Sequence, residues 1–476
     1  MHSPFSIAFP TFASTQGPSP LIGDWQGKLN TGAISLRIVF HIKEDSAGKL
    51  TATMDSPDQS YYGLPVGDVT ITDKVVKFDL PAVNGLLNGT LDDSGKVITG
   101  RWEQGGASLP ITVTLSDTPI VPVKRPQTPE APFPYTEKYI TFPSLAKGIT
   151  LAGTLTVPQG PGPFPAAVFV SGSGGQDRDE TMLGHKPFHV LADQLARLGI
   201  ATLRYDDRGV GLSNGDQAVG TSKDFANDAE GAHRFLKTAA NIKRTKIGFI
   251  GHSEGGLIAP MVAARNPDIA FVVMLAGPGV PGKDVILKQS EAIMKAMKAS
   301  PAEIKKSRDS QLKMFAAVEA VVRKNPSNPD PKKLVAALKK ETDALIAALP
   351  PAERIEAQRN RAMVDAQVQQ VATPWFRYFL NYDPRTALRK VKVPVLVMNG
   401  DKDLQVIASQ NVPEVEKALR AGGNKRVTVR LMRGLNHLFQ HTETGSPQEY
   451  GTIDETFAPE AIKEIAAFIR SVNRMK

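Results

Sequence analysis

The chain has 476 residues, too many for one small domain, so we expect at least two folded units. A hydrophobic content of 41% and a charged content of 22% are ordinary for a globular protein, and no apolar run of about 18 residues predicts a membrane span. Much of the net charge of +9 lies in a helical segment after residue 282, where acidic residues are interspersed and aromatic residues are lacking, which disfavours a nucleic-acid partner. Because the chain has no cysteine, disulfides, thiolate metal sites and a cysteine nucleophile are excluded.

The first part of the chain predicts a small all-β domain. Residues 1–20 are expected to form a tail, and the stretch up to Gln16 is a poor secretion signal because it has no Lys or Arg. Between residues 21 and 117, apolar and polar residues alternate in short runs separated by turn residues. Seven or eight such strands predict an antiparallel barrel or sandwich. The runs cover residues 34–42, 50–54, 69–71, 75–80, 87–91, 97–102 and 109–115.

A proline-rich linker at 118–135 separates this domain from a second one at 136–476. In the second domain, apolar strands alternate with helical patterns, which predicts a mostly parallel sheet with helices on both faces. The predicted strands are 150–157, 166–170, 201–205, 246–250, 271–275, 393–398 and 427–431, and the predicted helices are 186–198, 222–240, 256–265, 412–421 and 459–472. Residues 283–381 read as helical, with breaks at 325–331 and 350–351. This pattern favours a cap inserted over the carboxyl end of the sheet; a separate helical bundle is the alternative.

The nucleophile is predicted from Gly251-His252-Ser253-Glu254-Gly255, which lies between a buried strand and the start of a helix. A serine on a sharp turn from a strand into a helix, flanked by glycines, is a nucleophile elbow. A second match to the pattern surrounds Ser213, but it follows a charged loop and no helix comes directly after it. The context therefore selects Ser253.

A serine hydroxyl needs a base within hydrogen-bond reach and an acid that orients the base. In sheets of this kind these groups follow later strands in the order Ser, Asp or Glu, His. His437 follows the predicted strand 427–431 and is the predicted base, with His441 as the fallback. Asp403, after the strand 393–398, is the preferred acid, and we expect Asp401 to cap the turn.

The oxyanion of the reaction needs two rigid donors. We expect one to be the backbone N–H of Glu254 and the other to be the N–H of Ser173, with Gly174 as the second choice, in the glycine-rich loop after strand 166–170. A phosphate-binding loop is the alternative, but the Lys-Ser/Thr ending of such loops is lacking. The charge-rich segments 176–180 and 205–213 are expected to form ion pairs that brace these loops rather than a metal site, and Glu254 is a candidate partner in such pairs.

These motifs together resemble the bacterial EstD-type esterases of the α/β-hydrolase superfamily, which are related to dienelactone hydrolases and serine aminopeptidase-like proteins. The resemblance covers residues 136–476 and rests on the segments 171–179, 205–211, 251–256 and 276–280. It implies an α/β-hydrolase fold and a carboxylesterase active on short acyl chains, with Ser253, Asp403 and His437 as the triad. It also favours a secreted or periplasmic location, with the cytoplasm as the alternative.

The hypothesis is therefore a serine esterase that acts on a small-molecule ester without metal or cofactor. A peptidase or an acyl thioesterase on the same fold is the alternative function. A third hypothesis makes the N-terminal β domain an adaptor that binds polysaccharide or lipid. Its support is limited to Trp25, Tyr61, Tyr62 and Trp102, which fit a core equally well. The oligomeric state and the physiological substrate are not predicted.

Overall fold

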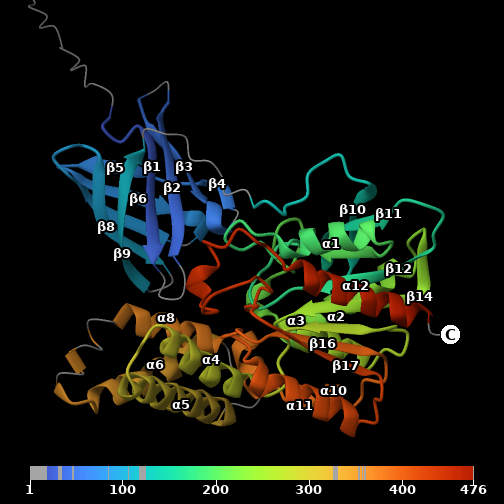
Figure 1. Ribbon diagram of the computed structural model, residues 1–476. Coiled ribbons are helices and arrows are strands. Elements are labelled where there is room, and N and C mark those ends of the chain that lie inside the picture. The colour runs from blue at the N-terminus through green and yellow to red at the C-terminus, as the bar shows by residue number, and fades with distance from the viewer. Residues whose placement is uncertain are drawn as a thin grey trace, which may run out of the picture. The chain divides into compact units, whose positions relative to one another are not determined.

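The computed structural model describes residues 19–30, 35–45, 48–59, 61–83, 85–104, 107–116, 125–324, 331–351, 354–355, 358 and 361–474 (Figure 1). The predicted tail, apart from its last two residues, and the first part of the predicted linker lie outside these ranges. The chain divides into two compact units, one with strands β1–β9 and the other with the elements from β10 to α12. No helix among the described residues combines the length and the apolar character needed to cross a membrane.

The first unit is one antiparallel sheet of nine strands in the order β4-β3-β2-β1-β9-β8-β7-β6-β5. Its two edge strands, β4 and β5, follow each other in the chain. Of the residues between them, Val66 donates its backbone N–H to Ala52 of β3, and Gly67 donates its backbone N–H to Asp79 of β6. The sheet thus curls toward closure, which is the barrel form of the prediction. The strands are β1 (Gly23–Asn30), β2 (Ser35–Glu44), β3 (Leu50–Ser56), β4 (Tyr61–Pro65), β5 (Val69–Thr72), β6 (Val75–Leu80), β7 (Gly85–Leu91), β8 (Val97–Gln104) and β9 (Ala107–Ser116).

The inward-facing residues of these strands form one apolar core, as period-two alternation requires. Trp25 and Trp102 belong to this core and are almost fully buried. The indole of Trp25 donates to the carbonyl of Leu21, at 2.8 Å. The idea that these tryptophans form an exposed binding stripe is therefore wrong, because each contributes its ring to packing.

The second unit contains an eight-stranded sheet in the order β10-β11-β13-β12-β14-β15-β16-β17. The pairs β10–β11 and β11–β13 are antiparallel, and the remaining pairs are parallel, as predicted for most of the sheet. The strands are β10 (Tyr135–Pro143), β11 (Thr150–Pro158), β12 (Phe164–Val170), β13 (Ala201–Tyr205), β14 (Ile242–His252), β15 (Val272–Leu275), β16 (Val395–Gly400) and β17 (Val427–Met432).

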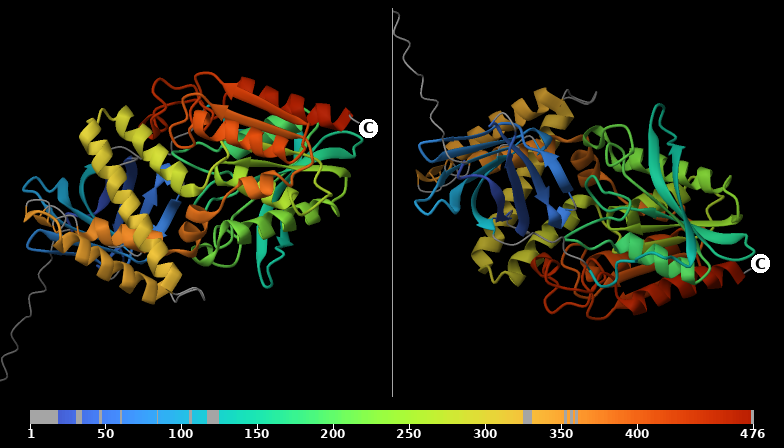
Figure 2. Two further views of the ribbon diagram at one scale, coloured as in Figure 1. Left: turned by 90° about the horizontal axis from the view of Figure 1, so that it is seen from below. Right: turned by 90° about the horizontal axis from the view of Figure 1, so that it is seen from above.

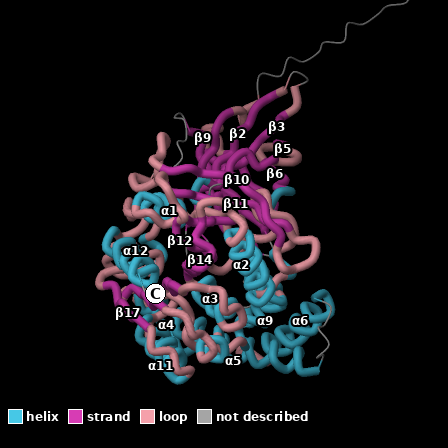
Figure 3. Tube along the Cα trace, turned by 90° about the vertical axis from the view of Figure 1, so that its right-hand side faces the viewer, coloured by secondary structure: helices cyan, strands magenta, loops and turns pink. Residues whose placement is uncertain are grey.

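Helices cover both faces of this sheet (Figure 3). Each face of the sheet packs on its helices through an apolar cluster. One cluster contains residues of α1 and α12, and the other contains residues of α2, α3 and α11. The near-continuous burial of β12, β15 and β16 follows from this double cover. The helices are α1 (Pro187–Arg197), α2 (Ser222–Leu236), α3 (Glu254–Ala263), α10 (Arg385–Leu388), α11 (Ala408–Ala421) and α12 (Pro459–Arg474).

Between β15 and β16 the chain leaves the sheet and forms a group of helices (yellow to orange in Figures 1 and 2). These helices share an apolar core of their own, which includes Phe315, Leu338 and Val371. They are α4 (Gly282–Ala296), α5 (Pro301–Lys324), α6 (Pro331–Ala347), α8 (Arg361–Ala372) and α9 (Pro374–Asn381).

Candidate active site

Ser253 lies on the turn between β14 and α3, with a backbone φ of +52° and ψ of −117°. This left-handed φ is unfavourable for a residue with a side chain, and such strain is typical of a functional turn. The N–H of Ser253 donates to the carbonyl of Leu275 at 2.8 Å, which ties the turn to the end of the neighbouring strand β15. A Cβ at Gly251 would lie 2.1 Å from the carbonyl oxygen of Gly255, so only glycine fits there. The local sequence thus holds a serine at the carboxyl edge of the sheet.

His437 and Asp403 are in direct contact after strands β17 and β16. The Nδ1 of His437 lies 2.9 Å from the Oδ2 of Asp403, and both residues are buried. Since a carboxylate accepts, Nδ1 carries the proton in the neutral ring, and Nε2 is left as the basic nitrogen. The other oxygen of Asp403 accepts the backbone N–H groups of Gln405 and Val406, at 2.8 and 2.9 Å, which fixes the carboxylate.

The alternative acid and base residues make other contacts. Asp401 accepts the backbone N–H of Gly434 at 2.7 Å, a turn contact. His441 is half exposed and lies 2.9 Å from both Glu455 and Glu460. Ser213 is buried and donates its hydroxyl to the carbonyl of Asp206, at 2.7 Å. Each of these contacts gives the residue a structural role.

Ser253 and His437 line one cavity of about 740 Å³ in the second unit. The glycine-rich loop after β12 reaches the same cavity through Gly172 and Ser173. A Cβ at Gly172 would lie 3.3 Å from the Cβ of Ser253, so this loop packs against the turn that carries the serine. Gly174 has a φ of +98° and is not among the residues that line the cavity.

Apolar side chains from the helices between β15 and β16 form much of the remaining wall. A cavity of this size and character is typical of a site for a small organic molecule. The apolar residues from these helices are Val285, Ile286, Met314, Phe315, Ala317, Leu338, Ile346, Val368, Val371, Trp375, Phe376 and Phe379, and Leu349 follows α6.

Glu254, the first residue of α3, has a buried side chain that accepts hydrogen bonds from neutral donors. The hydroxyl of Ser222 donates to it at 2.6 Å and the indole N–H of Trp375 at 2.8 Å. Burial raises the pKa of Glu254, and the bonds from Ser222, Trp375 and Ser173 oppose that rise. The expectation that Glu254 pairs with an arginine is therefore not met in these contacts. Sequence reasoning also missed Trp375, because its partner lies 121 positions away.

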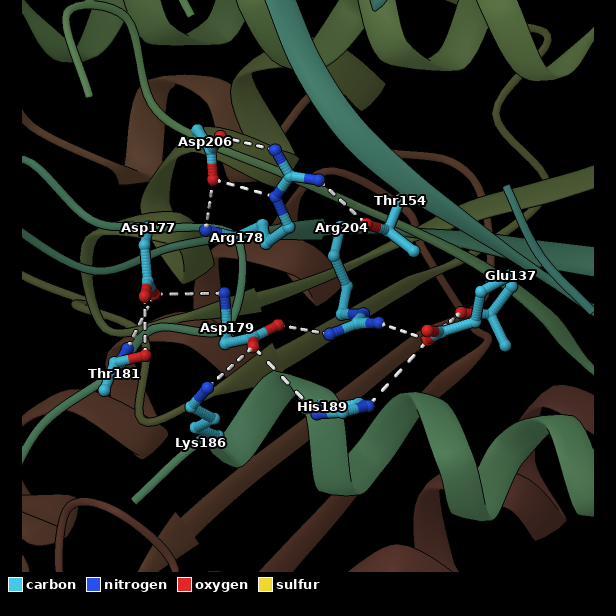
Figure 4. A network of polar contacts seen from close by, with 11 residues as sticks. Glu137, Thr154, Asp177, Arg178, Asp179, Thr181, Lys186, His189, Arg204 and Asp206 are labelled. Carbon is cyan, nitrogen blue, oxygen red and sulfur yellow. Dashed lines mark hydrogen bonds and ion pairs between the residues drawn. The ribbon is translucent and has the colours of Figure 1, made fainter. Parts of the chain in front are cut away.

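The charged runs form ion pairs, as expected (Figure 4). Arg178 binds Asp206 with its Nη2 2.6 Å from Oδ2, and Arg204 lies between Asp179 and Glu137. Within the described part of the chain, no group of three or more His, Asp or Glu residues is arranged to hold a metal ion. These pairs hold the loop at residues 176–181 against β13.

His185 is a cavity residue with a pKa well below its usual range. Burial and the nearby Arg125 lower this pKa to about 4. The ring is held neutral between the Thr456 hydroxyl and the carbonyl of Tyr450, at 2.9 and 3.0 Å. His185 takes up a proton near pH 6.5 in the unfolded chain but only near pH 4 in the folded protein. The neutral His185 ring therefore contributes fully to stability above pH 6.5, and this contribution is lost as the pH falls toward 4.

We therefore expect the free energy of unfolding to fall less steeply over this pH range in His185→Gln than in the unchanged protein. The difference accumulated between the two pH limits should be roughly 1–3 kcal/mol. Urea unfolding at a series of pH values measures it. Equal pH dependence in the two proteins would show that His185 titrates alike when folded and unfolded.

Comparison with known proteins shows the family to which the chain belongs. Residues 185–444 match the family described as serine aminopeptidase, S33. The chain is 26% identical over 398 residues to esterase EstD of Thermotoga maritima, an alignment that covers 83% of this chain and 78% of that protein. Among solved structures, the Pyrococcus furiosus esterase Pf2001 is 15% identical, with a TM-score of 0.42 over 73% of this chain and 97% of its own. Dienelactone hydrolase from Anabaena variabilis is 15% identical, with a TM-score of 0.37 over 71% and 98%.

Proposed function

Because the chain belongs to the serine aminopeptidase (S33) family of α/β hydrolases, we propose that it is a serine carboxylesterase that hydrolyses short-chain esters. The observation that carries this proposal is the contact between His437 and Asp403 at a cavity that Ser253 also lines. The similarity to esterase EstD supports the ester as the bond that is cleaved.

The proposed reaction has two steps. The Oγ of Ser253 attacks the ester carbonyl while Nε2 of His437 takes its proton, and the proton then passes to the leaving alcohol. A water molecule, deprotonated by the same nitrogen, attacks the acyl-enzyme and releases the acid. Asp403 keeps the imidazole oriented and stabilises its charged form.

The oxyanion of each step is proposed to lie between two backbone N–H groups. That of Glu254 is at the N-terminus of α3, where the helix dipole favours negative charge. The second is the N–H of Ser173, with Gly174 as the alternative. The N–H of Gly172 already donates to Glu180 at 2.6 Å, which leaves the next residue as the first candidate on this loop.

We also propose that residues 283–381 act as a cap, because side chains from α4, α5, α6, α8 and α9 contribute to the cavity wall. The proposed domains are a tail at 1–20, the β domain at 21–117, a linker at 118–135 and the catalytic domain at 136–476.

The family description also raises a second candidate, an aminopeptidase. Such an enzyme needs a carboxylate to bind the free ammonium group of its substrate, because a buried charge without a partner is costly. Among the described residues that line the cavity, the one carboxylate is that of Glu180, and it already accepts from Gly172 and lies 3.0 Å from His252. This disfavours a substrate with a free ammonium group.

A substrate panel tests this choice. We expect kcat/KM for a nitrophenyl butyrate to exceed that for an aminoacyl nitroanilide of matched size by at least about 100-fold, since about 3 kcal/mol separates a paired from an unpaired ammonium group. We also expect it to exceed kcat/KM for an acyl thioester of matched size. Ser253→Ala provides the blank for spontaneous hydrolysis. Faster turnover of the aminoacyl amide would replace the esterase by the peptidase, and faster turnover of the thioester would replace it by the thioesterase.

A further inference from the structure

Glu180 and His252 connect the loops that carry the proposed catalytic groups. We propose that these two residues form a charged brace, made of a carboxylate and an imidazolium, that positions the oxyanion loop and the base loop relative to Ser253. This inference rests on the proposed function, because it assigns a purpose to contacts around that triad.

The brace is a continuous chain of contacts across three loops. One oxygen of Glu180, Oε1, accepts the backbone N–H of Gly172 at 2.6 Å and lies 3.0 Å from Nδ1 of His252. The other ring nitrogen of His252, Nε2, lies 3.0 Å from the backbone carbonyl oxygen of His437. The loops after β12, β14 and β17 are thus joined through two side chains, both more than nine-tenths buried.

The contacts of His252 define its charge. A carboxylate oxygen and a carbonyl oxygen both accept, so each ring nitrogen must donate, and only the imidazolium carries a proton on both. Burial opposes this charge, but the attraction and hydrogen bond of Glu180 outweigh it, so the pKa of His252 is raised. The other titratable groups that face the ring are Asp403, whose charge favours the imidazolium, and His437, whose ring centre lies 4.8 Å away.

Asp179 and Thr181, the residues on either side of Glu180, belong to the network of polar contacts in Figure 4. The neighbouring Asp177 accepts the N–H and the hydroxyl of Thr181, at 2.9 and 2.6 Å, and Asp179 pairs with Arg204. Glu180 itself has a left-handed φ of +53°. A glutamate in this strained conformation needs compensating contacts, and the network on either side of it supplies them.

The brace has a direct consequence for catalysis. Gly172 packs against Ser253, so the bond from its N–H to Glu180 fixes where the next amide, that of Ser173, can point. The bond to the carbonyl of His437 fixes the backbone from which the base projects. Loss of the charge would loosen both loops by a fraction of an ångström, which is enough to impair the transition state while substrate still binds.

The variants Glu180→Gln and His252→Gln remove the charge and keep similar shapes. We expect each to lower kcat for a nitrophenyl ester by about 10- to 100-fold and to change KM by less than about threefold. A fluorophosphonate should still label one equivalent of each protein, but more slowly. Because the two residues act as one unit, kcat of the double variant should lie within about threefold of kcat of the less active single variant.

Glu230→Gln is the matched control, because Glu230 is a buried carboxylate that pairs with Arg265 and does not line the cavity. It should keep kcat within about twofold. Wild-type kcat in either folded brace variant would overturn the proposal. The proposal would also be overturned if the loss of kcat matched a smaller fraction of protein labelled by the fluorophosphonate, because the variant would then have lost folded protein and not catalytic rate. Activity that survives in Ser253→Ala would instead overturn the proposed function.

If circular dichroism shows that a brace variant is unfolded, the charge of His252 can be measured in protein that keeps both brace residues. Nitrogen-15 histidine NMR is recorded on protein carrying His41→Asn and His441→Asn, which removes two of the three described histidines that contact carboxylates away from the cavity. The third, His189, is kept because burial and the nearby Arg204 lower its pKa and so favour its neutral ring. The brace predicts a histidine that keeps both ring nitrogens protonated above the ordinary histidine pKa of about 6.5. Neutral rings throughout would overturn it.

Discussion

Replacing Ser253 with alanine should lower kcat for a short nitrophenyl ester by about 10⁴- to 10⁶-fold, because no other group can form the acyl-enzyme. The substitution removes one oxygen and leaves the left-handed φ of +52° unchanged, so the fold should be kept. Steady-state hydrolysis measures the rate, and thermal unfolding checks that the variant is folded.

Ser213→Ala is the matched control for this variant. Ser213 lies in the second Gly-x-Ser-x-Gly segment, but its hydroxyl donates to the carbonyl of Asp206 and accepts the N–H of Ala152. Its loss should lower stability by about 1 kcal/mol and leave kcat within a few-fold. Equal activity in the two alanine variants would remove Ser253 from the mechanism.

Asp403→Asn should lower kcat by about 10³- to 10⁴-fold with little effect on the fold. The amide can still accept the N–H groups of Gln405 and Val406 through its oxygen, which turns its NH₂ group toward Nδ1 of His437. His437 would then hold its proton on Nε2, the nitrogen that must act as the base. The measurement is kcat over a range of pH.

The neighbouring Asp401→Asn distinguishes a specific effect from a general one. The side chain of Asp401 accepts the backbone N–H of Gly434, a contact within the turn. An asparagine oxygen can accept the same N–H, so kcat should stay within a few-fold. A comparable loss in both variants would show that the loop, and not the acid, determines the rate.

The buried strands were predictable from sequence, whereas several edge strands were not. β12 and β16 are apolar throughout because helices cover both of their faces, and their patterns stand out. β10 is an edge strand with mostly polar, partly exposed residues, so its sequence resembles a loop. β1 and β4 were also missed, and β1 is rich in glycine and polar residues.

At the candidate site too, local sequence pattern decided which residues could be predicted. Ser253, Asp403 and His437 could be proposed because each follows its strand within a few residues, and local sequence carries that information. Glu180 and Trp375 could not, because they act through partners 72 and 121 positions away. The sequence marked Glu180 only as one of several charges in a loop, and the fold selects which of them turns toward His252.

The most direct test of this account is to label the protein with a fluorophosphonate ester and identify the modified peptide by mass spectrometry. A triad of Ser253, His437 and Asp403 predicts one equivalent of label, on Ser253, with the rate of labelling strongly reduced in Asp403→Asn. Label on any other residue, or undiminished labelling of Ser253→Ala, would contradict it.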